Sequence, residues 1–290
     1  MPRDKPACIF RLTSEQRFII LNANSETTGA ANLPSPTALR FNRFNRFNRS
    51  TSFMALIEVD NLTKTYHLPG GIDVPVLKGV SLSVEKGDLV ALMGASGSGK
   101  STLMNILGFL DTPSGGDYRF DGRDVSRLTS DERADLRAAR IGWVFQSFNL
   151  LARTSALQNV LMPLEYHRGR RAPRAREVER AKELLAMLGL EGRMDHTPAQ
   201  LSGGQQQRVA IARSLVNDPE ILFADEPTGN LDSKTTVEIL ELFRRLNAEK
   251  GITIVLVTHD AEVCDYTRRT IHVKDGLVVP GVPAAAQSAG

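Results

Sequence analysis

Long hydrophobic runs and cysteine pairs are missing from this sequence of 290 residues. The longest apolar runs, such as 18–21 and 252–257, are far shorter than the roughly 18 residues that a membrane-spanning helix requires. The two cysteines, Cys8 and Cys264, lie far apart and outside any C-x-x-C pattern. This spacing indicates neither a disulfide framework nor a zinc site, and it fits a reducing compartment. We therefore expect a cytoplasmic chain that does not itself cross a membrane.

An excess of either charge is also lacking, because the net charge is only +3. Residues 1–53 hold eight of the 36 Lys and Arg residues and three of the 33 Asp and Glu residues, so the rest of the chain is about neutral. A nucleic-acid-binding domain requires a basic surface on its folded part. The charge distribution therefore argues against nucleic acid as a partner.

Residues 1–53 show neither helical nor strand periodicity, and they carry an Arg-Phe-Asn repeat from Arg40 to Arg49. We interpret them as a disordered extension, since this composition cannot bury a core. Three alternatives are RNA binding through charge and stacking, an organellar transit peptide, and upstream sequence read through to a start at Met54. Residues 281–290 are expected to form a flexible tail.

From Ala55 onward, strand patterns alternate with helical ones, which predicts an α/β domain with a mostly parallel sheet. Residues from about 150 to 215 are mostly helical in pattern and predict a helical subdomain inserted into the sheet domain. The individual elements that we expect are strands over 88–93, 141–145, 221–224 and 252–257, a helix over 100–109, and a closing hairpin over 270–279 that turns at Asp275-Gly276.

A phosphate-binding motif follows the first of these buried strands. Eight consecutive residues match G-x-x-x-x-G-K-[ST], namely Gly94, Ala95, Ser96, Gly97, Ser98, Gly99, Lys100 and Ser101. Glycines let the backbone wrap around a phosphate chain, and the following helix directs its positive N-terminus toward that chain. Lys100 is expected to reach the β and γ phosphates, and the Ser101 hydroxyl to bind magnesium. A glycine-rich turn without a ligand is the alternative.

Two adjacent carboxylates end the apolar strand over 221–224. Asp225 is expected to hold the magnesium, and Glu226 to polarise a water molecule for attack on the γ-phosphate. The alternative is that they cap the turn at Pro227. Beside a phosphate-binding loop, the chemical interpretation is the stronger one, since ligands bind at the carboxyl ends of parallel strands.

The two motifs above are common to P-loop ATPases in general, whereas the pentapeptide from Leu201 to Gln205, Leu-Ser-Gly-Gly-Gln, is typical of one superfamily. With it the chain resembles the ABC-type ATPases, and the matching motifs extend over most of residues 55–279. The resemblance implies that Ser202, Gly203 and Gly204 bind the γ-phosphate of an ATP molecule held by the opposite subunit. A Ser-Gly-Gly sequence that opens a helix is indeed suited to an anion. A helix cap without a ligand is the alternative.

Four further residues match the family in its own order. The resemblance implies that Gln146 contacts magnesium and the attacking water, and that Tyr66 stacks on adenine. It also implies that Asp232 lies in the loop called the D-loop, where it is a candidate N-cap for the helix from Ser233, and that His259 hydrogen-bonds the γ-phosphate. Taken alone, Tyr66 would be an ordinary strand tyrosine and His259 a structural histidine.

The sequence around the motifs, over 76–82, 94–108 and 198–209, resembles ABC ATPases of the macrolide-export and lipoprotein-release type, a group that includes a cell-division ATPase. The implied fold is that of a P-loop NTPase: an ABC ATPase over 54–280 with a mostly parallel core sheet, an antiparallel β subdomain and an inserted α-helical subdomain. The implied assembly is a homodimer with ATP and Mg²⁺. It would drive a permease on a separate chain, which sets the transported substrate, from the cytoplasmic face of the inner membrane.

Two other classes remain as alternatives. A soluble ABC ATPase of translation or DNA repair would have a second cassette or a long coiled coil, and neither pattern is present. A non-catalytic nucleotide switch would lack the base, whereas Glu226 is present. The residues assigned by the resemblance are the catalytic Glu226, Gln146 and His259; the metal-binding Ser101, Gln146 and Asp225; and the nucleotide-binding Tyr66, Gly94 to Thr102, Ser202, Gly203, Gly204, Gln205 and Asp232.

Overall fold

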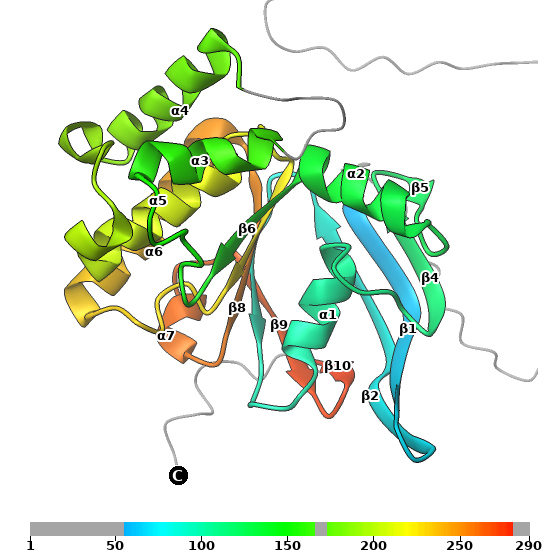
Figure 1. Cartoon of the computed structure of the whole chain (residues 1–290). Helices are drawn as coiled ribbons and strands as arrows, with labels where there is room; N and C mark the ends of the chain where they lie inside the picture. Colours follow the sequence, from blue (N-terminus) through cyan, green and yellow to red (C-terminus); the bar gives the residue numbers. More distant parts are fainter. Residues whose placement is uncertain (1–54, 166–172, 281–290) are drawn as a thin grey trace, which may run out of the picture. The chain divides into compact units, whose positions relative to one another are not determined.

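The structure, a computed structural model, describes residues 55–165 and 173–280 (Figure 1). The predicted extension over 1–53 and the predicted tail over 281–290 lie outside these residues, so both remain predictions. None of the helices in the described ranges is long and apolar enough to span a membrane.

A six-stranded sheet forms the centre of the described domain, with the strand order β10-β9-β3-β8-β7-β6. Its neighbours pair in parallel except for the terminal β9–β10 hairpin, which is antiparallel. The strands are β3 (Leu89–Met93), β6 (Ile141–Phe145), β7 (Ile221–Asp225), β8 (Thr253–Thr258), β9 (Arg269–Lys274) and β10 (Leu277–Val279). The predicted strands are all present, and the hairpin turns at Asp275 and Gly276, which both have positive φ (51° and 81°).

A second, antiparallel sheet has four strands in the order β2-β1-β4-β5. Its strands are β1 (Ala55–Leu68), β2 (Ile72–Glu85), β4 (Gly115–Phe120) and β5 (Arg123–Asp124). The two long strands β1 and β2 form a hairpin that extends beyond the rest of this sheet (Figure 1).

Helix α1 (Lys100–Leu107) lies between the two sheets, whereas α3 (Ala156–Glu165), α4 (Ala175–Met187) and α5 (Gly203–Leu215) gather on the opposite side of the six-stranded sheet (Figure 1). The described part of the predicted range from about 150 to 215 thus holds three α-helices and two 3₁₀ turns, η1 (Glu191–Arg193) and η2 (Pro198–Gln200). The remaining helices are α2 (Ser130–Arg140), α6 (Ser233–Lys250) and α7 (Ala261–Cys264).

Strand β7 is apolar up to its last residue, Asp225, because both of its faces are covered. Leu222 and Ala224 pack into the core that includes α3 to α6, whereas Ile221 and Phe223 pack into the core that includes α1, β1 and β2. Successive side chains of a strand point to opposite faces, so a strand covered on both faces needs apolar residues at every position.

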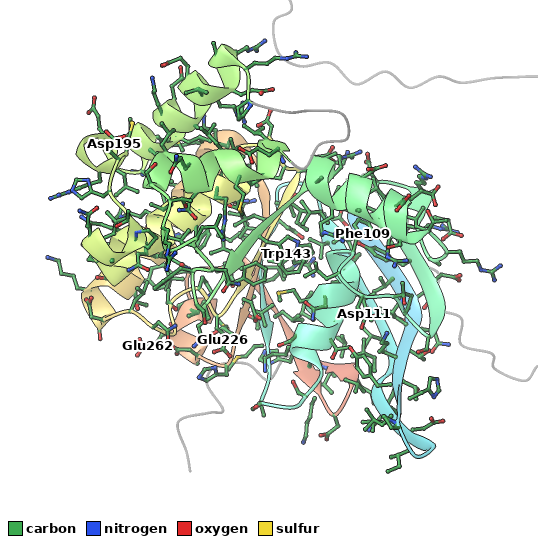
Figure 2. All side chains as sticks on the ribbon, viewed as in Figure 1. Phe109, Asp111, Trp143, Asp195, Glu226 and Glu262 are labelled. Atoms are coloured by element: carbon green, nitrogen blue, oxygen red, sulfur yellow. The ribbon has the colours of Figure 1, made fainter. Side chains whose placement is uncertain are left out.

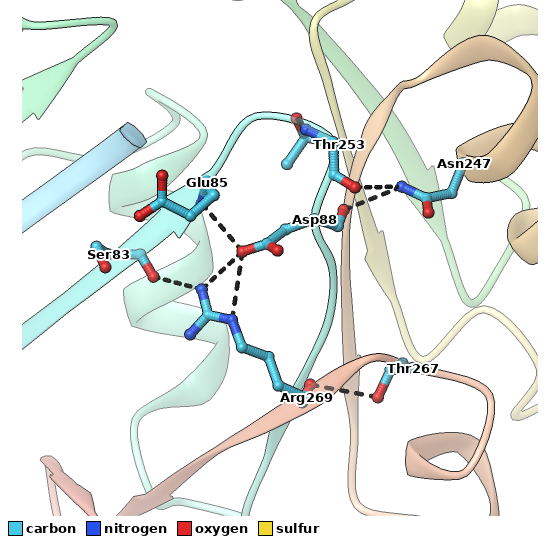
Figure 3. Close-up of polar contacts among 8 residues, drawn as sticks. Ser83, Glu85, Asp88, Asn247, Thr253, Thr267 and Arg269 are labelled. Carbon is cyan, nitrogen blue, oxygen red and sulfur yellow. Dashed lines mark hydrogen bonds and ion pairs between the residues drawn. The ribbon is translucent and has the colours of Figure 1, made fainter. Parts of the chain in front are cut away.

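The turn before β3 is held by a set of polar contacts (Figure 3). One oxygen of the Asp88 carboxylate accepts hydrogen bonds from the backbone N–H of Glu85 at 3.0 Å and from Nη2 of Arg269 at 2.8 Å. Asn247 on α6 donates to the carbonyl oxygen of Asp88 at 3.3 Å. These contacts tie the start of β3 to β2, β9 and α6, and so fix the strand that leads into the phosphate-binding motif.

Candidate functional site

The predicted phosphate-binding loop connects the end of β3 to α1, as the motif requires. The loop closes at Gly99, which has a φ of 103° that a residue with a Cβ would rarely adopt. Lys100 is only 7% exposed, and its Nζ donates to the carbonyl oxygens of Gly94 at 2.7 Å and Ala95 at 2.9 Å. The lysine is therefore folded back on its own loop.

Burial lowers the pKa of Lys100, while the nearby carboxylates of Glu226 and Asp225 act in the opposite direction. Burial raises the pKa of Asp225, and the charge of Glu226 raises it further. The three groups therefore share one electrostatic environment at the carboxyl ends of β3 and β7. A desolvated cluster of this kind at a strand end is typical of a functional site.

Glu226 adopts an unusual backbone conformation, with a φ of 43°. Its N–H donates to the carbonyl oxygen of Val257 at 2.9 Å, and one of its carboxylate oxygens lies 2.8 Å from Nδ1 of His259. Figure 2 shows Glu226 at this end of the sheet, near α7. A left-handed conformation at a non-glycine residue is costly, and it clusters at functional sites.

Gln146 follows β6, whose last residue, Phe145, pairs with Asp225 in the sheet register. The side chain of Gln146 packs against Gly229, where an added Cβ would lie 2.6 Å from Nε2 of the glutamine. The side chain of Asn230 donates to the backbone oxygen of Gln146 at 3.0 Å. Gln146 and the loop after Glu226 therefore form one contact surface.

The Ser202–Gln205 segment lies in a different part of the molecule. Ser202 is the N-cap of α5, where its hydroxyl accepts from the N–H of Gln205 and the Gln205 side chain accepts from the N–H of Ser202. Gly204 leaves no room for a Cβ beside Thr235 at the start of α6. Helix α5 packs against α3, α4 and β6, on the other side of the six-stranded sheet from α1, which follows the phosphate-binding loop (Figure 1).

Asp232 is the N-cap of α6, as the sequence predicted. Its carboxylate accepts hydrogen bonds from the N–H of Thr235 at 3.0 Å and from the Thr235 hydroxyl at 2.6 Å. Thr235 thus contacts both the segment that contains Gly204 and the loop that contains Asp232.

Tyr66 lies on β1, and its polar contacts are made with residues other than Asp225 and Glu226. Its hydroxyl donates to Asp111 at 2.8 Å, and the Nζ of Lys64 lies 4.7 Å from the centre of its ring. The sequence predicted Tyr66 but not its two neighbours. Lys64 could have been found from the two-residue period of a strand, whereas Asp111 carries no local signal.

Sequence patterns also did not single out Gln207, which is fully buried on α5. Its Nε2 donates to the carbonyl oxygen of Pro227 at 2.6 Å, while its Oε1 has no partner within the described residues. Gln207 therefore connects the helix that begins at Ser202 with the turn that carries Glu226.

The groups around the phosphate-binding loop suit a hard cation that is bound together with a phosphate chain. Ser101, Asp225 and Gln146 offer hydroxyl, carboxylate and amide oxygens, which Mg²⁺ prefers to sulfur or nitrogen ligands. No group of three or more His, Cys, Asp or Glu residues in the described ranges could hold a metal by itself.

The sequence profile of the ABC transporter family matches residues 77–229. Two similar relatives are both called "Macrolide export ATP-binding/permease protein MacB". The protein from Syntrophobacter fumaroxidans is 60% identical over 78% of this chain and 32% of its own length. The protein from Rhodopirellula baltica is 54% identical over 80% of this chain and 34% of its own length. The chain thus spans about a third of the length of these curated relatives.

Solved structures agree with the sequence relatives. A dimeric structure of MJ0796, a bacterial ABC transporter cassette, matches with a TM-score of 0.70 and 47% identity over 77% of this chain and 97% of that one. The same cassette, in a dimeric post-hydrolysis state bound to ADP and Pi, matches with a TM-score of 0.70 and 46% identity over the same shares. Fold and site together define a nucleotide-binding ATPase domain of the P-loop type. The chain belongs to the ABC transporter family, as an ATP-binding cassette.

Proposed function

We propose that two copies of this chain form a homodimer with two composite sites for ATP, and that hydrolysis in these sites drives a membrane permease. The observation that supports the dimer is that one chain holds two anion-binding features, the phosphate-binding loop and the start of α5, in separate places. The phosphate-binding loop opens α1, whereas Ser202 caps α5 on the other side of the sheet. A second copy, facing the first, would supply Ser202, Gly203 and Gly204 to the γ-phosphate.

In each site, the backbone of Gly94 to Thr102 cradles the phosphates, and Lys100 exchanges its two carbonyl partners for the β and γ oxygens. This exchange is favourable because a buried ammonium gains a charged partner in place of neutral carbonyl groups. Tyr66 offers its ring to the adenine, since nucleobases stack on aromatic side chains. Asp232 orders the start of α6 beside Gly204.

Glu226 is the proposed general base, and it takes the proton of the water that attacks the γ-phosphate. His259 holds the Glu226 carboxylate through the 2.8 Å contact and turns to the γ-phosphate when ATP is bound. Ser101, Asp225 and Gln146 would hold Mg²⁺, which neutralises phosphate charge when bound. Gln146 also orients the attacking water, since it lies beside the turn that carries Glu226.

The proposed partner is a permease on a separate chain, which would place this ATPase at the cytoplasmic face of the inner membrane. The family and the two relatives, whose names combine ATP binding with a permease, support coupling to transport. Those relatives are about three times as long as the matched region, so a permease fused to the same chain is the alternative. Macrolide export, lipoprotein release and force transmission are the candidate tasks.

We also propose that residues 54–280 form the complete ATPase domain, with the helical subdomain over about 150–215. The presence of α3, α4 and α5 within that range supports this division. The extension over 1–53 and the tail over 281–290 would then lie outside the catalytic domain.

Light scattering of the full chain tests the dimer. The Glu226→Gln variant should retain ATP and shift from monomer to dimer at saturating ATP, whereas Lys100→Ala should remain monomeric because the phosphates lose their main cation. Lys250→Ala, at the exposed end of α6, is the matched control and should behave like the parent. A Glu226→Gln protein that stays monomeric at saturating ATP and high concentration would contradict the composite site.

A further inference from the structure

The side chain of Tyr66 lies against three residues, Lys64, Asp111 and Thr102, which we call the tyrosine clamp. The Tyr66 hydroxyl donates to one oxygen of Asp111 at 2.8 Å, and Nζ of Lys64 binds the other oxygen at 2.7 Å. Thr102, on the first turn of α1, lies close enough to Tyr66 to act on the pKa of its hydroxyl. The clamp therefore joins β1, α1 and the segment after α1 around one aromatic ring.

Lys64 is the most constrained member of the clamp. It is only 8% exposed, and its Nζ also donates to the carbonyl oxygen of Thr112 at 2.7 Å. Because side chains two residues apart point to the same face of a strand, Lys64 and Tyr66 lie side by side on β1. Nζ of Lys64 covers one face of the ring at 4.7 Å, so a ligand that stacks must use the other face.

The charges of the clamp are balanced. Burial alone would raise the pKa of the Asp111 carboxyl, but the hydrogen bonds from Lys64 and Tyr66 outweigh this and lower its pKa below the ordinary value. Burial and the hydrogen bond to Asp111 raise the pKa of Tyr66, so the phenol stays protonated. At neutral pH the clamp is therefore an ion pair with a neutral tyrosine that donates to it.

We propose that the tyrosine clamp pre-orders Tyr66 as a platform for the base of the nucleotide, with Asp111 as its positioning residue. This inference rests on the proposed ATPase function and on the stacking role of Tyr66. A ring that is already fixed loses little conformational entropy when a base stacks on it, so binding is tighter. Figure 2 shows Asp111 between α1 and the β1–β2 hairpin, away from Glu226, so the clamp acts on the base and not on the hydrolytic step.

A competitor without a nucleobase distinguishes a role of Asp111 in binding the nucleobase from a general structural role. In the full chain, Asp111→Asn should raise the KM for ATP about three- to tenfold, the range expected when one side chain must be ordered on binding, and kcat should stay within about twofold. The inhibition constant of inorganic tripolyphosphate should not change, because that molecule fills the phosphate-binding loop and has no base. Tyr66→Phe, which keeps the ring but loses the bond to Asp111, should act in the same direction.

The control is Asp73→Asn, since Asp73 makes an exposed contact of 2.6 Å with Nδ1 of His67 in the same hairpin. This variant should match the parent for both ligands. The decisive comparison places Asp111→Asn in a Tyr66→Leu background, where it should have no further effect on the KM, because the residue through which it acts is gone.

Three outcomes would overturn the inference. The first is an unchanged KM for ATP in both Asp111→Asn and Tyr66→Phe, and the second is a loss of tripolyphosphate binding as large as the loss of ATP binding. The third is that Asp111→Asn raises the KM for ATP as much in the Tyr66→Leu background as in the parent. If Asp111→Asn does not fold, Tyr66→Phe still gives the answer, because it leaves the pair of Lys64 and Asp111 intact. A parent chain that does not hydrolyse ATP would instead refute the proposed function.

Discussion

Replacing Glu226 with Gln isolates the proton-accepting role of the proposed base. Glutamine keeps the length of the side chain and one acceptor oxygen for the contact with His259. The backbone bond from residue 226 to the carbonyl oxygen of Val257 is unaffected, so the turn with its φ of 43° should persist. What is lost is the ability to take a proton from water.

The expected size of the effect distinguishes a base from a positioning group. A positioned general base contributes about 10² to 10⁴ in rate, which corresponds to about 2.7 to 5.5 kcal/mol of activation free energy. Loss of one hydrogen bond to His259 would cost only about 0.5 to 1.5 kcal/mol, or at most about tenfold. A decrease of more than about a hundredfold therefore identifies the base.

The assay is phosphate release by the full chain at saturating ATP, with ATP affinity measured separately. Affinity should survive, because glutamine removes no contact to the phosphates. The matched control is Glu262→Gln, which changes an exposed carboxylate of α7 near Glu226 (Figure 2) and should leave turnover unchanged. If Glu226→Gln hydrolyses ATP within about threefold of the parent, a difference of about 0.65 kcal/mol, then Glu226 is not the base.

Two further predictions concern stability. The raised pKa of Asp225 means that its ionisation costs stability as pH rises through the carboxyl range, so without nucleotide Asp225→Asn should melt higher than the parent at neutral pH. This gain should disappear in acid below the ordinary carboxyl pKa, and an equal or lower melting temperature at neutral pH would refute the sign. Gln207→Leu should lower the free energy of unfolding by about 1 to 3 kcal/mol, because the buried carbonyl of Pro227 loses its donor. Urea denaturation measures the free energy of unfolding. An unchanged free energy would contradict the prediction and would mean that removal of the unpaired Oε1 offsets the loss of the donor to Pro227.

The strands and the motifs could be predicted because their signals are local. Strands β3, β6, β7 and β8 are apolar between their end residues, since both faces of the sheet are covered. The predicted ranges differ from the observed ones by at most one residue at each end. The closing hairpin was predicted from Asp-Gly, a pair that favours the positive φ values found at both positions. The N-cap expected at Asp232 is present, and Ser202 also caps its helix, which was the alternative interpretation of the Ser-Gly-Gly sequence.

The contacts that join distant segments could not be predicted in this way. Asp111 is 45 residues from Tyr66 in sequence, and Gln207 is 20 residues from Pro227. A single sequence does not specify which partner a buried polar side chain finds, only that it needs one. The motifs therefore indicated which groups could meet a nucleotide, whereas Asp111 beside Tyr66 and Gln207 beside Pro227 emerged only from the packing.

The backbone of Glu226 illustrates why the packing matters for the chemistry. Nothing in the sequence around Glu226 predicts a left-handed conformation. Adopting this conformation costs a glutamate residue on the order of 1–3 kcal/mol. The conformation persists because Glu226 and two residues after it are bound elsewhere: the N–H of Glu226 to Val257, the carbonyl of Pro227 to Gln207, and the side chain of Asn230 to Gln146. These anchors come from β8, from α5 and from the loop after β6. The direction of the Glu226 carboxylate is thus determined by three parts of the domain together. A substitution that weakens any one of these contacts should displace the proposed base even when Glu226 itself is unchanged.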